Sequence, residues 1–194
     1  GSNPSYGPEA TPERFAKHAD RMGANKEAID KILDTPLGIS IPRMTKIGED
    51  WFSLFNCLGI CQFPVVNRFY SVGLCSELYS AATGIELDTS SIMTAAERAW
   101  NMSKVLNVRD GSSRKDDKYP ERWLEPFKMS DGQERRLTDY SGTKTISKED
   151  LEQFLDEYYD QRGWDITKGI PTEEKLMSLG LEDVAKDLSQ SGLL

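Results

Sequence analysis

The chain has 194 residues, 38% hydrophobic and 29% charged, a balance typical of a globular protein with one good core or two small ones. Its formal net charge of −8 argues against a general nucleic-acid binder, and no apolar run approaches the ~20 residues that a membrane span needs. The odd number of cysteines, three, disfavours disulfides and indicates a reducing cytoplasm. The single histidine, His18, and the absence of phosphate-loop motifs weaken hydrolase and nucleotide-binding interpretations.

Residues 1–10 are rich in Gly, Pro and Ser, so we expect a flexible lead-in before one helical domain at 11–194. Gly1-Ser2 has the form of a remnant left by a cleaved expression tag, which suggests a piece of a longer protein. Thr11, followed by Pro12, predicts a helix start, with helices to about Met22 and then over 26–33. A third helix is expected over 41–57, because its apolar residues recur at helical spacing.

The second half of the chain also favours helices. We expect them at 69–83, at about 89–108 after an Asp88 or Thr89 cap, from Ser147 to Gly163, at 173–178 and at 182–188. Residues 118–146 lack a clear period and predict a long surface crossing, with a turn of helix at 121–125. No strand pattern stands out, so the predicted fold is all-α, an irregular multi-helix domain without a substantial sheet.

The third helix runs into the stretch Asn56-Cys57-Leu58-Gly59-Ile60-Cys61-Gln62-Phe63. Gly59 should break the helix and let the backbone approach something bulky. Cys57 and Cys61 are four residues apart, so both thiols could face one metal ion, although two thiolates cannot close a tetrahedral site. The alternative is that both are ordinary packing residues, as we expect for Cys75 on the apolar face of its helix.

Two polar stretches can likewise be interpreted either as binding sites or as structural contacts. Residues 109–117, which include Arg109, Arg114 and Asp117, could hold an anion, but a self-neutralising salt-bridge network is the preferred interpretation. Near the end of the predicted helix 148–162, Arg162 could pair with Asp165, while Trp164 packs inward. Tyr158 and Tyr159 are expected at the core and its rim.

Several stretches together resemble the C-terminal part of the aldehyde ferredoxin oxidoreductase family, the tungsten-pterin enzymes. Their order and approximate spacing match the family over roughly residues 45–185. The matching pieces are residues 56–61 (NCLGIC), 77–84 (ELYSAATG), 97–101 (ERAWN), 107–111 (NVRDG), 114–117 (RKDD), 120–122 (PER), 158–165 (YYDQRGWD) and 169–172 (GIPT).

The resemblance implies roles for the first piece. Cys61 is implied to be the last of four thiolate ligands to a 4Fe-4S cluster, and Asn56, Ile60 and Gln62 are implied to contact one pterin of a tungsten bis-pterin cofactor, with Gly59 letting the backbone close on it. Cys57 then has only a packing role. The sequence departs from the family in having Asn56 where the family has an acid. The cysteines that supply the other three cluster ligands are absent from this chain.

As a C-terminal fragment, the chain is expected to bind no complete cofactor and to be inactive alone. Its parent would oxidise aldehydes to acids with ferredoxin, or another electron-transfer protein, as acceptor. The chain's partners would be the missing N-terminal and middle domains, with no nucleic acid or membrane. Two alternatives stand beside this: a family member that reduces an aromatic acyl-CoA thioester, and a non-enzymatic helical interaction module. The module predicts a fully buried Cys61, whereas the fragment predicts Cys61 at the surface beside an exposed apolar patch.

Overall fold

The computed structural model describes residues 11–36, 38–62, 69–139 and 142–194, so the expected lead-in at 1–10 lies outside the described residues. The predicted all-α class is confirmed. The helices are α1 (Pro12–Arg21), α2 (Lys26–Leu33), α3 (Ile41–Leu58), α5 (Val72–Thr83), α6 (Thr89–Arg109), α7 (Lys148–Arg162), α8 (Glu173–Ser178) and α9 (Glu182–Gln190), with short 3-10 turns η1 (Arg114–Asp116) and η2 (Glu121–Leu124).

Side-chain caps explain why most helix starts were predictable. The side chains of Thr11 and Asp88 accept from backbone N–H groups in the first turns of α1 and α6. Ser147 and Asp150 form a reciprocal capping box at α7. The prediction that α5 begins at Phe69 was wrong, because Ser71 caps the helix by accepting from the N–H of Leu74.

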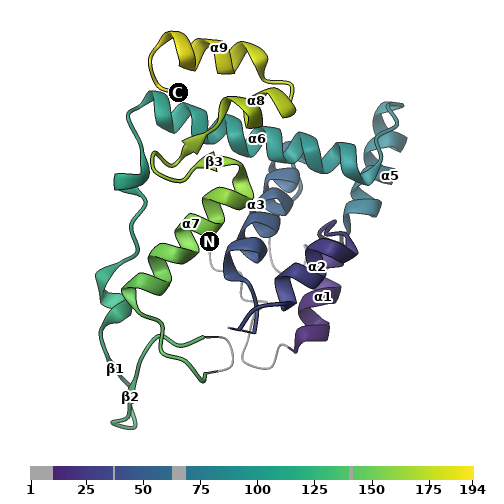
Figure 1. Cartoon of the computed structure of the whole chain (residues 1–194). Coiled ribbons are helices and arrows are strands. Elements are labelled where there is room, and N and C mark those ends of the chain that lie inside the picture. The colour runs from purple at the N-terminus through teal and green to yellow at the C-terminus, as the bar shows by residue number, and fades with distance from the viewer. Residues whose placement is uncertain (1–10, 37, 63–68, 140–141) are drawn as a thin grey trace.

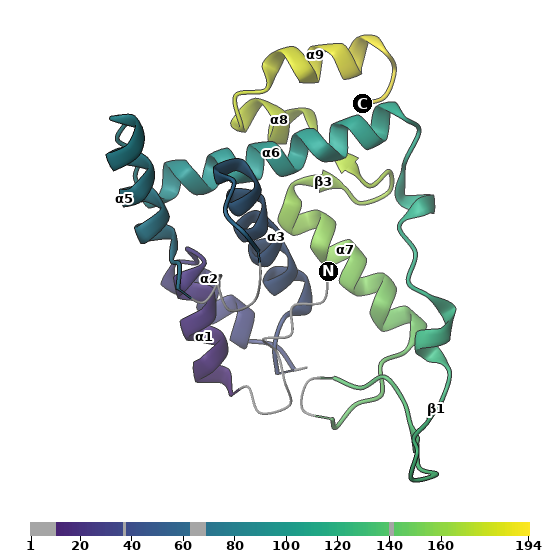
Figure 2. The ribbon, with the colours of Figure 1, turned by 180° about the vertical axis from the view of Figure 1, so that it is seen from behind.

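Helix α3 lies at the centre of the fold. Figure 1 shows α6 running across the molecule, with α3 and α7 below it and α8 and α9 above it. The reverse view in Figure 2 shows the same layers, with α1, α2 and α5 beside α3 and α7 on its other side. Because α3 contacts α2, α6 and α7, its two ends are held by different parts of the chain.

The main core forms around the apolar face predicted for α3. Trp51, Leu54 and Phe55 are fully buried, and residues of α1, α2, α5 and α6 pack against them. A second cluster joins Val105 of α6 to α8 and α9, and a third surrounds Phe154 of α7. Within the described ranges, no helix is long and apolar enough to cross a membrane.

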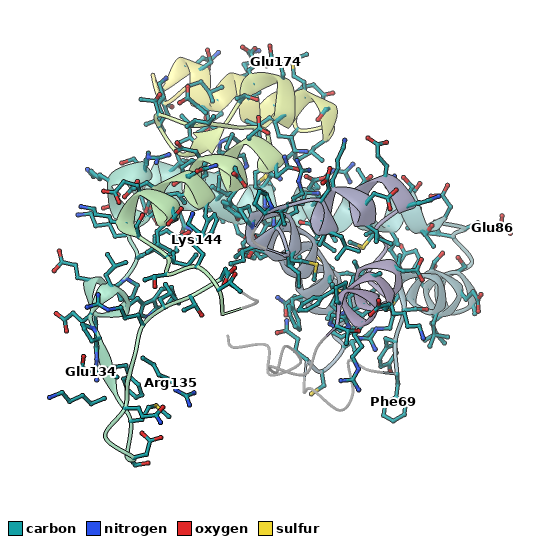
Figure 3. The ribbon with its side chains drawn as sticks, turned by 60° about the horizontal axis from the view of Figure 1, so that its bottom comes forward. Phe69, Glu86, Glu134, Arg135, Lys144 and Glu174 are labelled. Carbon is teal, nitrogen blue, oxygen red and sulfur yellow. The ribbon has the colours of Figure 1, made fainter. Side chains whose placement is uncertain are left out.

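Two short antiparallel strand pairs were not predicted. β1 (Phe127–Lys128) pairs with β2 (Glu134–Arg135), and β3 (Trp164–Asp165) pairs with β4 (Ile170–Pro171). Two residues are too few to show an alternating pattern, so the sequence carries no strand signal here. Figure 3 shows that β1 and β2 form an arm that stands away from the helices, with Glu134 and Arg135 on it.

Candidate functional site

The candidate site begins where α3 ends. Gly59 has the left-handed conformation, with φ of 68° and ψ of 23°. The N–H of Gly59 donates to the carbonyl of Asn56 (3.3 Å), and the N–H of Ile60 donates to that of Phe55 (2.9 Å), which is the Schellman pattern. Only glycine adopts this backbone at little cost, so the predicted break at Gly59 is confirmed.

The predicted site residues surround this turn. Asn56, Cys61 and Gln62 are exposed, and Ile60 is partly buried against the main core. The side-chain amide of Gln62 donates to Asn56 Oδ1 (2.5 Å) and to the carbonyl oxygen of Phe52 (3.2 Å). The chain after Gly59 therefore turns back beside the last turns of α3, and two of the implied pterin contacts touch each other.

The three cysteines differ in their surroundings. Cys61 and Cys57 are free thiols at the surface, whereas Cys75 is fully buried. Burial raises the pKa of the Cys75 thiol to about 11, so Cys75 is the expected core residue. The packing role expected for Cys57 was wrong in the part of the chain that the structure describes, because Cys57 is exposed there. Within the described ranges, no cluster of three or more His, Cys, Asp or Glu side chains could hold a metal ion.

The turn is open toward the described residues. A Cβ atom placed on Gly59 would meet no atom of the described residues within 4 Å. The thiol of Cys61 lies on the same exposed turn, and thiolate is the ligand that iron–sulfur clusters take. The amides of Asn56 and Gln62 offer hydrogen-bond donors and acceptors suited to a polar heterocycle.

The matching piece on α6 is structural. The indole N–H of Trp164 donates to Asn101 Oδ1 (2.8 Å), and both side chains are buried. Arg98 Nε donates to the carbonyl of Leu179, which links α6 to the turn before α9. Glu97 lies between Lys46 Nζ (3.2 Å) and Lys175 Nζ (2.7 Å). Each of these residues therefore joins α6 to another element.

The matching piece at 158–165 corrects one expectation. Arg162 is fully buried and pairs with Asp50 (2.5 Å) and Glu49 (2.6 Å) of α3, and not with Asp165. Asp165 instead accepts from the backbone N–H of Lys168. Trp164 packs inward as expected. Sequence analysis missed Glu49 and Asp50, although charged residues between Ile47 and Trp51 on a core helix were a visible signal.

These charges form one chain of alternating sign. Lys46 Nζ also lies 2.8 Å from Asp50, so the ion pairs run without a gap through four helices. In order the members are Lys175, Glu97, Lys46, Asp50, Arg162 and Glu49. Burial lowers the pKa of Arg162 by itself, but Asp50, Tyr158 and Glu49 outweigh it and raise that pKa. Burial raises the pKa of Glu49, because Arg162 only partly offsets it.

The salt-bridge network preferred for residues 109–117 is present, but the ion-pair partners of Arg109, Arg114 and Asp117 lie outside the stretch. Arg114 pairs with Asp156 (2.6 Å) and Glu152 (3.2 Å) of α7. Lys104 Nζ lies 3.0 Å from Asp117, which also accepts from the hydroxyl of Tyr159. The stretch is therefore not self-neutralising, and these pairs fasten the chain after α6 to α6 and α7.

Residues 7–181 match the model of a known family, described as aldehyde ferredoxin oxidoreductase, domains 2 and 3. The chain belongs to the aldehyde ferredoxin oxidoreductase family. The tungsten-containing aldehyde ferredoxin oxidoreductases of Pyrococcus horikoshii and Pyrococcus abyssi are 30% and 32% identical to it, over 144 and 146 residues. The enzyme of Pyrococcus furiosus is 28% identical over 144 residues. Each match covers 73% of this chain, but the chain spans only about a fifth of each relative (21%).

The fold of this family member is also found in a solved structure. The structure is the active-site complex BamBC of benzoyl coenzyme A reductase with 1,5-dienoyl-CoA. The match has a TM-score of 0.67 and 22% identity, and it covers 100% of this chain and 29% of the other. At this identity the likeness establishes the shared fold of the two chains.

Proposed function

We propose that this chain is the C-terminal part of a tungsten-pterin, 4Fe-4S oxidoreductase that oxidises aldehydes to acids. The observation that carries the proposal is the exposed thiol of Cys61, two residues after a left-handed glycine, in a chain of this family. Relatives named as tungsten-containing aldehyde ferredoxin oxidoreductases support the tungsten chemistry and the aldehyde substrate.

In this proposal the turn at Gly59 contacts both the 4Fe-4S cluster and one pterin of the parent enzyme. Cys61 is a thiolate ligand of the cluster, whose other three ligands come from outside this chain. Asn56, Gly59, Ile60 and Gln62 contact the pterin, through side-chain amides and through backbone left accessible by the missing Cβ. The bound centre supplies two-electron redox chemistry and one-electron transfer. Asn56 accepts hydrogen bonds as the family's acid does, but without charge assistance.

The non-enzymatic alternative predicts a fully buried Cys61, and the exposed thiol speaks against it. The acyl-CoA alternative has support only from a shared fold at 22% identity, whereas the relatives at 30% and 32% carry the aldehyde name. We therefore favour aldehyde oxidation. The isolated chain should be colourless and inactive. The further partners we propose are the preceding domains of the parent and a ferredoxin-like acceptor, in the cytoplasm.

The experiment is to express the parent polypeptide with tungstate and to measure tungsten content and aldehyde-dependent reduction of ferredoxin. We expect bound tungsten and aldehyde oxidation. An enzyme that holds tungsten but reduces an aromatic acyl-CoA, with no aldehyde oxidation, would overturn the substrate assignment.

A pair of variants at one position tests the pterin contact. Asn56→Leu removes the amide and should lower the tungsten content severalfold, whereas Asn56→Asp keeps an acceptor and should retain it. Equal tungsten content in both variants would show that Asn56 is no pterin contact. Far-UV circular dichroism of each variant checks that the exposed substitution leaves the fold intact.

A further inference from the structure

A second concave site lies at the other end of α3. It is a cleft of about 420 Å³ between the N-terminal half of α3, the C-terminal half of α6 and α7, closed at one side by residues 117–119. Figure 1 shows the two helices α3 and α7 running beside each other under α6. This volume lies within the range of small-molecule sites, roughly 300–1,000 Å³. Glu49 on its wall lies ten residues before Gly59, about 15 Å along a helix, so the cleft is separate from the cofactor turn.

Aromatic side chains form most of the apolar wall. Trp100, Tyr119, Phe154, Tyr158, Tyr159 and Trp164 all line the cleft. The rings of Tyr158 and Tyr159 lie 5.7 Å and 5.9 Å from that of Trp164. Tyr159 and Trp164 are buried, so the partly exposed rings on this wall are those of Trp100, Tyr119 and Tyr158. Flat faces of this kind stack well against a planar ring.

Tyr158 and Tyr159 each hold one carboxylate of the cleft in place through a hydrogen bond. Tyr158 donates its hydroxyl to Glu49 Oε2 (2.7 Å), and Tyr159 donates to Asp117 Oδ2 (2.5 Å). Arg162 and Lys104 bind those same two oxygens. In the part of the chain that the structure describes, no hydrogen bond or ion pair uses Glu49 Oε1 or Asp117 Oδ1. The cleft therefore offers two oriented acceptors on side chains that are already held in place.

Two cations near the cleft, Lys104 and Arg162, each pair with one oxygen of these carboxylates and leave the other oxygen for a ligand. The Lys104 side chain is only 10% exposed and lies over the ring of Trp164, with its charge paired to Asp117. Arg162 is fully buried behind Glu49. Lys118 lines the cleft from an exposed position, where solvent screens its charge. The inner surface thus presents aromatic faces and carboxylate oxygens.

We propose that this cleft is a binding site for a planar aromatic small molecule that carries an amino, amide or amidine group. The ring stacks on the partly exposed rings of Trp100, Tyr119 and Tyr158. The N–H groups donate to Glu49 Oε1 or to Asp117 Oδ1, as charge-assisted hydrogen bonds. The site forms no part of the proposed cofactor contacts, so it can be tested on the isolated chain.

The test uses benzamidine and benzoate as probes of the same ring size, followed through the fluorescence of the tryptophans that line the cleft. Benzamidine should bind at least roughly tenfold more tightly than benzoate, because only benzamidine can donate to the free carboxylate oxygens. Benzoate binding as tightly as benzamidine would overturn the proposal. So would tighter binding of N-acetylarginine amide than of benzamidine, which would assign the cleft to a protein side chain.

A variant that places a larger side chain in the cleft tests whether benzamidine binds there. Thr45 is an exposed residue of α3 that lines the cleft, so Thr45→Phe should weaken benzamidine binding roughly tenfold by occupying the space. Thr89→Phe, at an exposed position at the start of α6 away from the cleft, is the matched control and should leave the affinity unchanged. Equal affinity in both variants would show that benzamidine binds elsewhere.

Discussion

Arg162 Nη1 donates to Asp50 Oδ1 across 2.5 Å, joining α7 to α3 at a point sealed from solvent. The Arg162 side chain is 0% exposed and the Asp50 side chain 4%. A buried charge is costly without its partners, and removal of either residue leaves the other with one ion pair fewer, Asp50 with Lys46 and Arg162 with Glu49. The pair therefore joins α7 to the helix that ends at the Gly59 turn.

Replacing Arg162 tests this role. Arg162→Met keeps much of the side-chain volume but leaves Glu49 without its cation and Asp50 with Lys46 alone, and we expect a loss of about 3–5 kcal/mol in the free energy of unfolding. Urea unfolding followed by circular dichroism measures it. Lys31→Met removes one half of an exposed pair with Glu27, where solvent screens both charges, and should cost far less than Arg162→Met. Equal losses in the two variants would contradict the account.

The bond from Trp164 to Asn101 makes a second prediction. Trp164→Phe removes the indole N–H and leaves the buried Asn101 Oδ1 without its donor, so stability should fall by about 1–3 kcal/mol for that bond, with a further loss from the smaller ring. Trp123→Phe changes a half-exposed ring on η2 and is the control, with little expected effect. A control that unfolds at lower urea concentration than Trp164→Phe would refute this assignment.

Much of the fold could be predicted because its signals are local. Caps such as Thr11 and Ser147, and the glycines that end α3 and α7, act within one turn of the chain. The strand pairs were missed because each strand has two residues. The partner of Arg162 was missed because Asp50 is 112 residues away, while the wrong candidate, Asp165, is a sequence neighbour.

At the candidate site, too, features set by neighbouring residues could be predicted, and features set by the packing of distant helices could not. Gly59 could be read as a break from the residues around it, and the structure places it in the left-handed conformation. The exposure of Cys57 could not be predicted from the sequence, since it depends on which side of α3 other helices cover. The cleft with Glu49 and Asp117 was not foreseen, because its walls come from α3, α6 and α7, which only the fold brings together.

Acid should weaken the chain of ion pairs at Glu97. Burial by itself raises the pKa of Glu97, but Lys46 and Lys175 more than offset it, so the folded-state pKa lies below 4.5. A carboxyl with a lowered pKa contributes stability above its unfolded pKa and loses it as pH falls through the folded pKa. Glu97→Gln should therefore destabilise the protein at pH 7, with a difference from wild type that shrinks below about pH 4.

The measurement is urea unfolding of wild type and Glu97→Gln between pH 3 and pH 7. Glu86→Gln removes a carboxylate from an exposed loop residue and should follow the wild-type curve across this range. A constant difference between Glu97→Gln and wild type at every pH would show that the ion pairs of Glu97 do not contribute as described.

The central claim is that Cys61 is a ligand of the cluster in the parent enzyme, and iron content tests it most directly. The parent should be purified anaerobically as wild type, Cys61→Ser and Cys57→Ser, since Cys57 is also an exposed thiol, four residues earlier in the chain. We predict that Cys61→Ser loses most of its iron and its electron paramagnetic resonance signal, while Cys57→Ser keeps both. Wild-type iron content and an unchanged signal in Cys61→Ser would contradict the account.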